Sequence, residues 1–229
     1  MSNEIALMRE ITKLQSQIDS LRTIEISGIQ SNGWLRDSDT WVYVSATQFK
    51  IVGKDVAAKF PVGTKIKLTQ TTTKYFYVTA AAFSTDTTVT ITGGSDYSLA
   101  NATITDPYYS YAATPQGFPQ WFSYTSTVTY VGGTTDPTSL TVEMKFSVIG
   151  KLVFIRLIST LMRGSGDRTY IVHTLPISYV VATSGSVSIT FSSYSPCHNY
   201  LQSGNQWAWY VNTMSSDGYG FGTIFYEIA

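Results

Sequence analysis

Short runs of β-branched and aromatic residues recur through most of this 229-residue chain, and turn residues separate them. Such runs predict strands, because Val, Ile, Thr, Tyr and Phe fit the pleated surface of a sheet. The segment Lys65–Gly94 is typical, since it is rich in Thr, Tyr and Val and contains no His, Cys or Glu. We therefore expect an all-β chain with one exception, a short helix at the N-terminus.

Residues 1–28 carry the pattern of that helix. Their apolar residues alternate spacings of four and three, which is a heptad seam made of Leu7, Ile11, Leu14, Ile18 and Leu21. A helix this short is marginal alone in water, so its apolar stripe needs a cover. We favour a parallel coiled coil with copies of the chain over packing on the chain's own β domain. The heptads alone lean towards a dimer and do not specify a trimer.

Residues 33–111 predict a small closed β-barrel used as a spacer. The expected strands, of which the first can divide into two, are Thr40–Ile51, Thr64–Gln70, Thr73–Ala80 and Thr87–Thr92. A helical turn is expected at Lys54–Phe60, and the segment Ala112–Pro119 has the composition of a linker.

Residues 120–229 predict a C-terminal antiparallel β-sandwich of jelly-roll-like type, with about eight strands at roughly ten-residue spacing. The strand-like runs are Trp121–Tyr130, Ser139–Ile149, Lys151–Ile158, Arg168–Leu175, Ser186–Ser192, Gln206–Thr213 and Tyr219–Ile228. Within the second run, apolar residues alternate with polar ones from Leu140 to Val148, which predicts one buried face.

Composition excludes several classes of function. Lys plus Arg and Asp plus Glu number 15 each, and the absence of a basic excess argues against binding to nucleic acid. The most apolar run, Leu152–Met162, is too short for a membrane span and contains Arg156. The N-terminus lacks the apolar core of a signal peptide, so synthesis in a cytoplasm is expected. One cysteine and two histidines predict no disulfide, zinc site or cofactor.

A coiled-coil start, a small barrel and a terminal sandwich, in this order, resemble a bacteriophage tail fibre or receptor-binding protein. Thr40–Ile51, Ala58–Ala80 and Val89–Ile104 resemble a module of tail and baseplate-associated proteins, mostly from phages of Firmicutes; they cover about a third of the chain. More loosely, the C-terminal region resembles trimeric β-sandwich heads, through the segments Lys151–Leu161, Arg163–Asp167, Thr174–Ile177 and Gly222–Ile228.

The resemblance implies a homotrimeric virion protein on the tail, the baseplate or the capsid exterior. The barrel would be a rigid scaffold, the N-terminal helix would contact other virion proteins, and the head would attach to a glycan of the host surface. Two alternatives remain, a purely structural fibre or decoration without a receptor, and a glycan-degrading spike.

A glycan site needs aromatic faces together with amide, hydroxyl and charged groups. These types gather near the C-terminus, and the expected receptor contacts are Tyr194, His198, Asn199, Tyr200, Trp207, Trp209, Asp217 and Tyr219. Trp207 and Trp209 point to the same side of one strand, so the alternative is that one or both pack in the core or between subunits. His173 alternates with apolar residues and is expected to be packed.

No catalytic constellation stands out, so we do not expect an enzyme. Glycoside hydrolysis requires two carboxylates across a cleft, and the head offers only Asp136, Glu143, Asp167, Asp217 and Glu227. Cys197 and His198 are adjacent in the chain, and neighbouring strand residues do not face each other as a catalytic pair must. The loop Arg163–Asp167 contains Gly-x-Gly outside the strand–helix context of a nucleotide site and is expected to be a turn.

Overall fold

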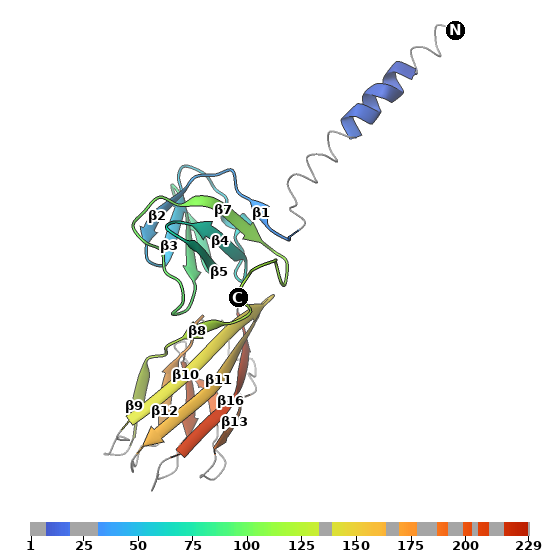
Figure 1. The fold of residues 1–229 in the computed structure, drawn as a ribbon. Coiled ribbons are helices and arrows are strands. Elements are labelled where there is room, and N and C mark those ends of the chain that lie inside the picture. The colour runs from blue at the N-terminus through green and yellow to red at the C-terminus, as the bar shows by residue number, and fades with distance from the viewer. Residues whose placement is uncertain are drawn as a thin grey trace.

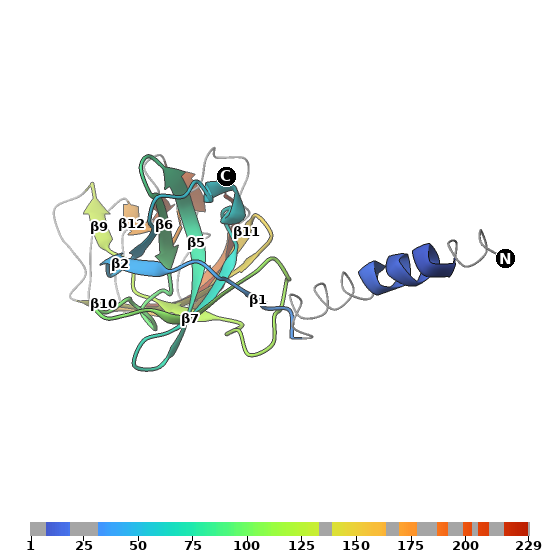
Figure 2. The same ribbon diagram turned by 90° about the horizontal axis from the view of Figure 1, so that it is seen from above.

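The structure is a computed structural model that describes residues 8–18, 32–132, 139–163, 170–177, 187–191, 199–202, 206–210 and 218–228. It is mostly β with one short helix, at residues 8–18, which confirms the predicted class at this level. The helix stands clear of the sheets in both views (Figures 1 and 2). Its seam residues Ile11, Leu14 and Ile18 are 48%, 55% and 49% exposed, so the chain's own sheets do not cover them. Leu7 and Leu21 lie outside the described residues.

Seven antiparallel strands form one sheet between residues 35 and 110, in the order β1-β7-β4-β5-β6-β3-β2. The strands are β1 (Leu35–Arg36), β2 (Trp41–Ser45), β3 (Gln48–Ile51), β4 (Lys65–Thr69), β5 (Thr73–Phe83), β6 (Thr87–Thr92) and β7 (Thr105–Ser110). The two outermost strands, β1 and β2, follow each other in the chain. Five residue steps from Arg36 to Trp41 span at most about 17 Å, so the sheet must curl until its edges approach.

The curled sheet is filled by large apolar side chains, as a barrel-like core requires. Trp41 stacks on Phe49 with ring centroids 4.2 Å apart, and Phe60 meets both rings edge-on. Phe60 follows the 3-10 helix η1 (Ala57–Lys59), which occupies the expected helical turn. The predicted strand count of about five is wrong, because β1 and β7 were missed.

The remaining strands form two antiparallel sheets. The five-stranded sheet has the order β13-β16-β11-β10-β8, and the four-stranded sheet has the order β14-β15-β12-β9. The strands are β8 (Phe122–Tyr124), β9 (Val128–Val131), β10 (Ser139–Ile149), β11 (Leu152–Arg163), β12 (Tyr170–Thr174), β13 (Val187–Phe191), β14 (Asn199–Gln202), β15 (Gln206–Tyr210) and β16 (Gly218–Glu227). Met144, Phe146 and Val148 are buried as the alternation predicts.

Two details of this region differ from the sequence prediction. The expected strand Trp121–Tyr130 is divided into β8 and β9, which belong to different sheets, because the chain crosses over at the polar residues 125–127. The segment Asn199–Gln202, which none of the expected strands includes, is strand β14. One hydrophobic cluster nevertheless takes side chains from both sheets, including Phe146 of β10 and Trp207 of β15.

Candidate interaction surface at the domain junction

The structure describes only part of the expected receptor site. Tyr194, His198 and Asp217 lie outside the described residues. Asn199 and Tyr200 lie on β14, Trp209 on β15 and Tyr219 on β16, and for these four only the strand positions are described. The register places Asn199 opposite Trp209 and Tyr200 opposite Ala208, so β14 and β15 bring two of the expected residues together.

Trp207 is fully buried, which is the packing role that the sequence left open. Its ring stacks on His173 across the pair β12–β15, with centroids 4.6 Å apart and planes 16° from parallel. His173 is also fully buried, as predicted, and its Nδ1 lies 2.8 Å from the hydroxyl oxygen of Ser126. Burial lowers the pKa of His173 to about 3, so the imidazole is neutral at ordinary pH. Trp207 therefore offers no surface to a receptor within one protomer.

The curled sheet and the five-stranded sheet meet in a shared aromatic cluster. Tyr77 of β5 lies at its centre and is 1% exposed. Its ring centroid is 5.0 Å from that of Phe118, 5.3 Å from Phe122 and 6.1 Å from Phe146. Phe118 belongs to the segment expected to be a linker. That segment is therefore packed into the junction, and the expectation of a simple connection is corrected.

Hydrogen bonds reinforce this junction on two sides. The hydroxyl oxygen of Tyr77 accepts a bond of 3.2 Å from the backbone N–H of Val148, and burial raises the pKa of Tyr77. Farther along, the backbone N–H of Ser95 donates to the carbonyl oxygen of Ser123 at 2.8 Å. The N–H of Ser123 in turn donates to a carboxylate oxygen of Asp96 at 2.7 Å. Since backbone atoms on both sides are bonded, the two parts cannot slide past each other freely.

Gly94 lets these backbones approach so closely. It has a φ of +60°, and a Cβ atom at this position would overlap the carbonyl oxygen of Ser123. Gly53 has a similar φ of +66°, but a Cβ atom there would meet nothing within 4 Å. The two glycines therefore share the left-handed backbone and differ in the space around them.

Gly94→Ala is expected to reduce the free energy of unfolding by about 1–3 kcal/mol more than Gly53→Ala does. Both changes carry the left-handed penalty of about 1–2 kcal/mol, and only the first forces the junction apart. Denaturant unfolding of the two variants at equal protein concentration measures the difference. Equal losses would mean that the contact at Gly94 can relax without cost.

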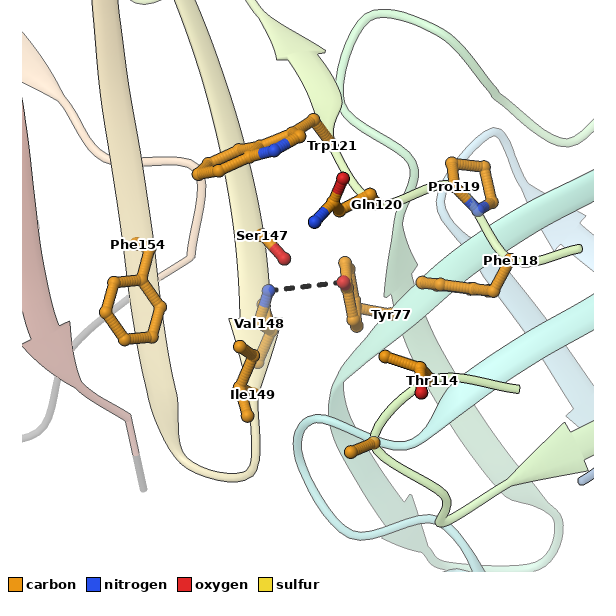
Figure 3. Close-up of a pocket in the computed structure, with 11 residues that line it drawn as sticks. Tyr77, Thr114, Phe118, Pro119, Gln120, Trp121, Ser147, Val148, Ile149 and Phe154 are labelled. Atoms are coloured by element: carbon orange, nitrogen blue, oxygen red, sulfur yellow. Dashed lines mark hydrogen bonds between the residues drawn. The ribbon is translucent and has the colours of Figure 1, made fainter. Parts of the chain in front are cut away.

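A cavity of about 440 Å³ lies where the linker, the curled sheet and the hairpin β10–β11 meet (Figure 3). Tyr77 and Phe118 form one wall, and Phe154 and Val148 lie on the opposite side. Trp121 lies across one end, and the Gln120 amide points into the space between the walls (Figure 3). The lining is mainly apolar, with hydroxyl and amide groups at a few places, which suits an apolar or amphipathic group.

Beside the cavity lies a group of large apolar side chains that we call the junction patch: Trp121, Ile149, Leu152, Phe154 and Phe225. Cross-strand pairing places Ile149 opposite Leu152, and Phe154 opposite Phe225. Ile149, Leu152 and Phe225 are 53%, 42% and 38% exposed, whereas Trp121 and Phe154 are half-buried. Sequence reasoning missed this patch, although the alternation of Leu152, Phe154 and Arg156 on one side of a strand is visible in the sequence.

The described carboxylates do not form a hydrolytic pair. Asp136, Asp167 and Asp217 lie outside the described residues. Glu143 is paired with Ser159 in the second half of β11, and Glu227 is paired with Leu152 at its first residue. Seven residues of strand separate those two positions by about 20 Å. Glycosidases need two carboxyl groups within about 10 Å of each other, so Glu143 and Glu227 cannot act together as a catalytic pair.

In the described part of the chain, no three His, Cys, Asp or Glu side chains gather as a metal site would require. The described helix is also too short and too polar to cross a membrane. Comparisons of the chain with protein families, with curated proteins and with solved structures find no match.

Proposed function

We propose that this chain is a structural fibre protein of a bacteriophage virion, a homotrimer whose C-terminal head attaches to a glycan of the host surface. The observation that carries the proposal is an uncovered apolar seam on a helix that stands apart from the β body (Figure 1). A helix of this length gains little stability alone, so the seam needs a partner helix. Copies of the same chain supply identical seams, which is how a coiled coil forms.

The β body supports the same proposal through its rigidity. We treat the five- and four-stranded sheets as the faces of a β-sandwich head, since one cluster of buried side chains draws on both. The shared core around Tyr77 holds the curled sheet against this head. A rigid spacer keeps a binding surface at a constant distance from its anchor, and three linked heads bind a repetitive surface with avidity.

Self-association is tested by the native mass in solution. Sedimentation at several concentrations is expected to give three times the 25.2 kDa of one chain, stable on dilution. Leu14→Asp places a charge in the seam and is expected to weaken the association by tenfold or more, because a buried charge is costly. Ser16→Asp, two residues farther along on the opposite, outer face of the same helix, is the matched control and should leave the mass unchanged. A monomeric wild-type chain at every concentration would overturn the proposal.

Host attachment needs a separate experiment. The labelled full chain is expected to bind host cells specifically and saturably, and removal of surface glycans should abolish that binding. Binding to no plausible host would favour a structural fibre without a receptor of its own. Release of reducing ends from wall or capsule material would instead indicate the glycan-degrading alternative.

A further inference from the structure

The junction patch lies on the outer face of the five-stranded sheet, opposite the buried cluster. Phe154 and Phe225 are adjacent on β11 and β16, with ring centroids 6.3 Å apart. One step closer to the hairpin tip, Ile149 and Leu152 are also adjacent, and both are exposed. Soluble monomers seldom expose contiguous apolar side chains of this size unless the surface binds something.

The cavity next to the junction patch gives this apolar surface a concave part. Phe154, Ile149 and Trp121 belong both to the patch and to the cavity wall. A concave apolar site beside exposed aromatic rings is the arrangement in which protein interfaces bury an anchoring side chain. The Gln120 amide and the Ser147 hydroxyl group line the same space and provide polar partners for such an anchor (Figure 3).

The charges around the patch indicate which kind of partner fits. Lys145 and Arg156 are paired directly across β10 and β11, and like charges in this arrangement repel. Glu143 and Glu227 are exposed on the same face. Among the described residues, none of these four side chains takes part in an ion pair.

These four strand positions carry two charges of each sign, and Lys151 adds one exposed positive charge at the hairpin tip. The surroundings of the patch therefore carry both signs with only a small positive excess, which does not strongly select an anionic or a cationic polymer. A second copy of the same chain carries both signs and can pair with each of them. The chain as a whole is also neutral, with 15 basic and 15 acidic residues, and net repulsion between copies is therefore absent.

We propose that a second copy of this chain packs on the junction patch and inserts an apolar side chain into the cavity, making this face a contact between subunits. The inference rests on the self-association in the proposed function. A seam that holds helices in parallel keeps the attached β bodies at high local concentration, so a weak contact between them suffices. The partner copy would then complete the cavity wall that one protomer leaves open.

Site-specific photocrosslinking in the full chain tests the contact directly. A benzoylphenylalanine at position 225 keeps the aromatic bulk and is expected to give covalent products of two chains. The control is the same residue at position 83, because Phe83 of β5 is 45% exposed but lies outside the patch. Sedimentation of Phe225→Asp is expected to show association weakened by at least about tenfold, and Phe83→Asp should match the wild type.

The outcomes separate this inference from the proposed function. An oligomeric wild type with no products from position 225, and unchanged association in Phe225→Asp, overturns the contact and leaves the fibre proposal standing. A monomeric wild type overturns self-association itself. Phe225→Asp could instead keep the native mass of the wild type and lose binding to host cells. That result would identify this face as the receptor site and would also overturn the contact.

Discussion

Replacing Tyr77 with alanine is expected to lower the free energy of unfolding by about 3–5 kcal/mol, the range for removing a large buried aromatic side chain. The ring is almost fully buried and contacts three other aromatic rings at the junction. Tyr77 belongs to the curled sheet, whereas Phe122 and Phe146 belong to the five-stranded sheet, so losing the ring weakens the coupling between the two parts. We therefore expect one cooperative unfolding transition in the wild type and two separate transitions in Tyr77→Ala.

Two further variants identify the cause. Tyr77→Phe keeps the ring and removes only the hydroxyl group that accepts from Val148, so a loss of about 1 kcal/mol and a single transition are expected. Tyr43→Ala removes a half-buried aromatic ring that packs in the curled sheet away from the junction, and it should leave the two parts coupled. Denaturant unfolding at one fixed protein concentration, followed by tryptophan fluorescence and by circular dichroism, measures all three. A single transition in Tyr77→Ala would refute the coupling.

Asp37→Ala is expected to cost about 3–5 kcal/mol, because it removes the nearer counter-charge of the partly buried Lys59 ammonium group, leaving only Asp39 at 3.4 Å, and also leaves the buried indole N–H of Trp41 without its acceptor. The side chain of Asp37 is fully buried between β1 and β2. One carboxylate oxygen accepts a bond of 2.6 Å from Nζ of Lys59, and the other accepts a bond of 2.9 Å from the indole N–H of Trp41. Burial alone would lower the pKa of Lys59, but the hydrogen bond and charge of Asp37 raise it overall.

The position of Asp37 explains why the effect should be large. Strands β1 and β2 are the outermost strands of the curled sheet and are not paired with each other. Asp37 connects them and ties both to η1 through Lys59 and to β7 through its own N–H, which donates to the carbonyl oxygen of Pro107 at 2.9 Å. Removing the carboxylate therefore loosens the place where the sheet would otherwise open.

A surface ion pair in the same sheet provides the control. Arg36 and Asp106 are 3.3 Å apart, and their side chains are 66% and 55% exposed. Asp106→Asn is expected to cost less than about 1 kcal/mol, as exposed pairs generally do. Thermal and urea unfolding compare the two variants, and similar losses would show that the buried carboxylate has no special role.

The sequence predicted the elements whose pattern is local. The heptad seam, the alternating face of β10 and the strand character of Thr87–Thr92 depend only on neighbouring residues. Strand β7 was missed because Pro107 interrupts it, and Asp106 takes a φ of +46° where the pairing with β4 slips. A proline can be accommodated in a sheet at such a bulge, but no local sequence pattern predicts where the bulge will form.

The candidate surface was beyond sequence reasoning for a different reason. Alternation shows that Phe76 and Tyr77 lie on opposite faces of one strand, yet it does not show what covers either face. Phe118 and Phe146 pack against Tyr77, and they lie about 40 and 70 residues farther along the chain. The aromatic residues Phe118, Trp121 and Phe122 are the available signal, but the prediction divides them between a linker, because proline and glycine accompany Phe118, and the strand that begins at Trp121.

The turn at Gly63 rests on the tip of the hairpin β10–β11, where a Cβ atom would lie only 2.6 Å from the carbonyl oxygen of Gly150. Two bare backbones in contact leave no layer of side chains that could be compressed. A force applied to the curled sheet would consequently pass to the hairpin β10–β11 directly through the backbone at this contact. We therefore expect a torque on the curled sheet to turn the hairpin β10–β11 with it, with little bending between them.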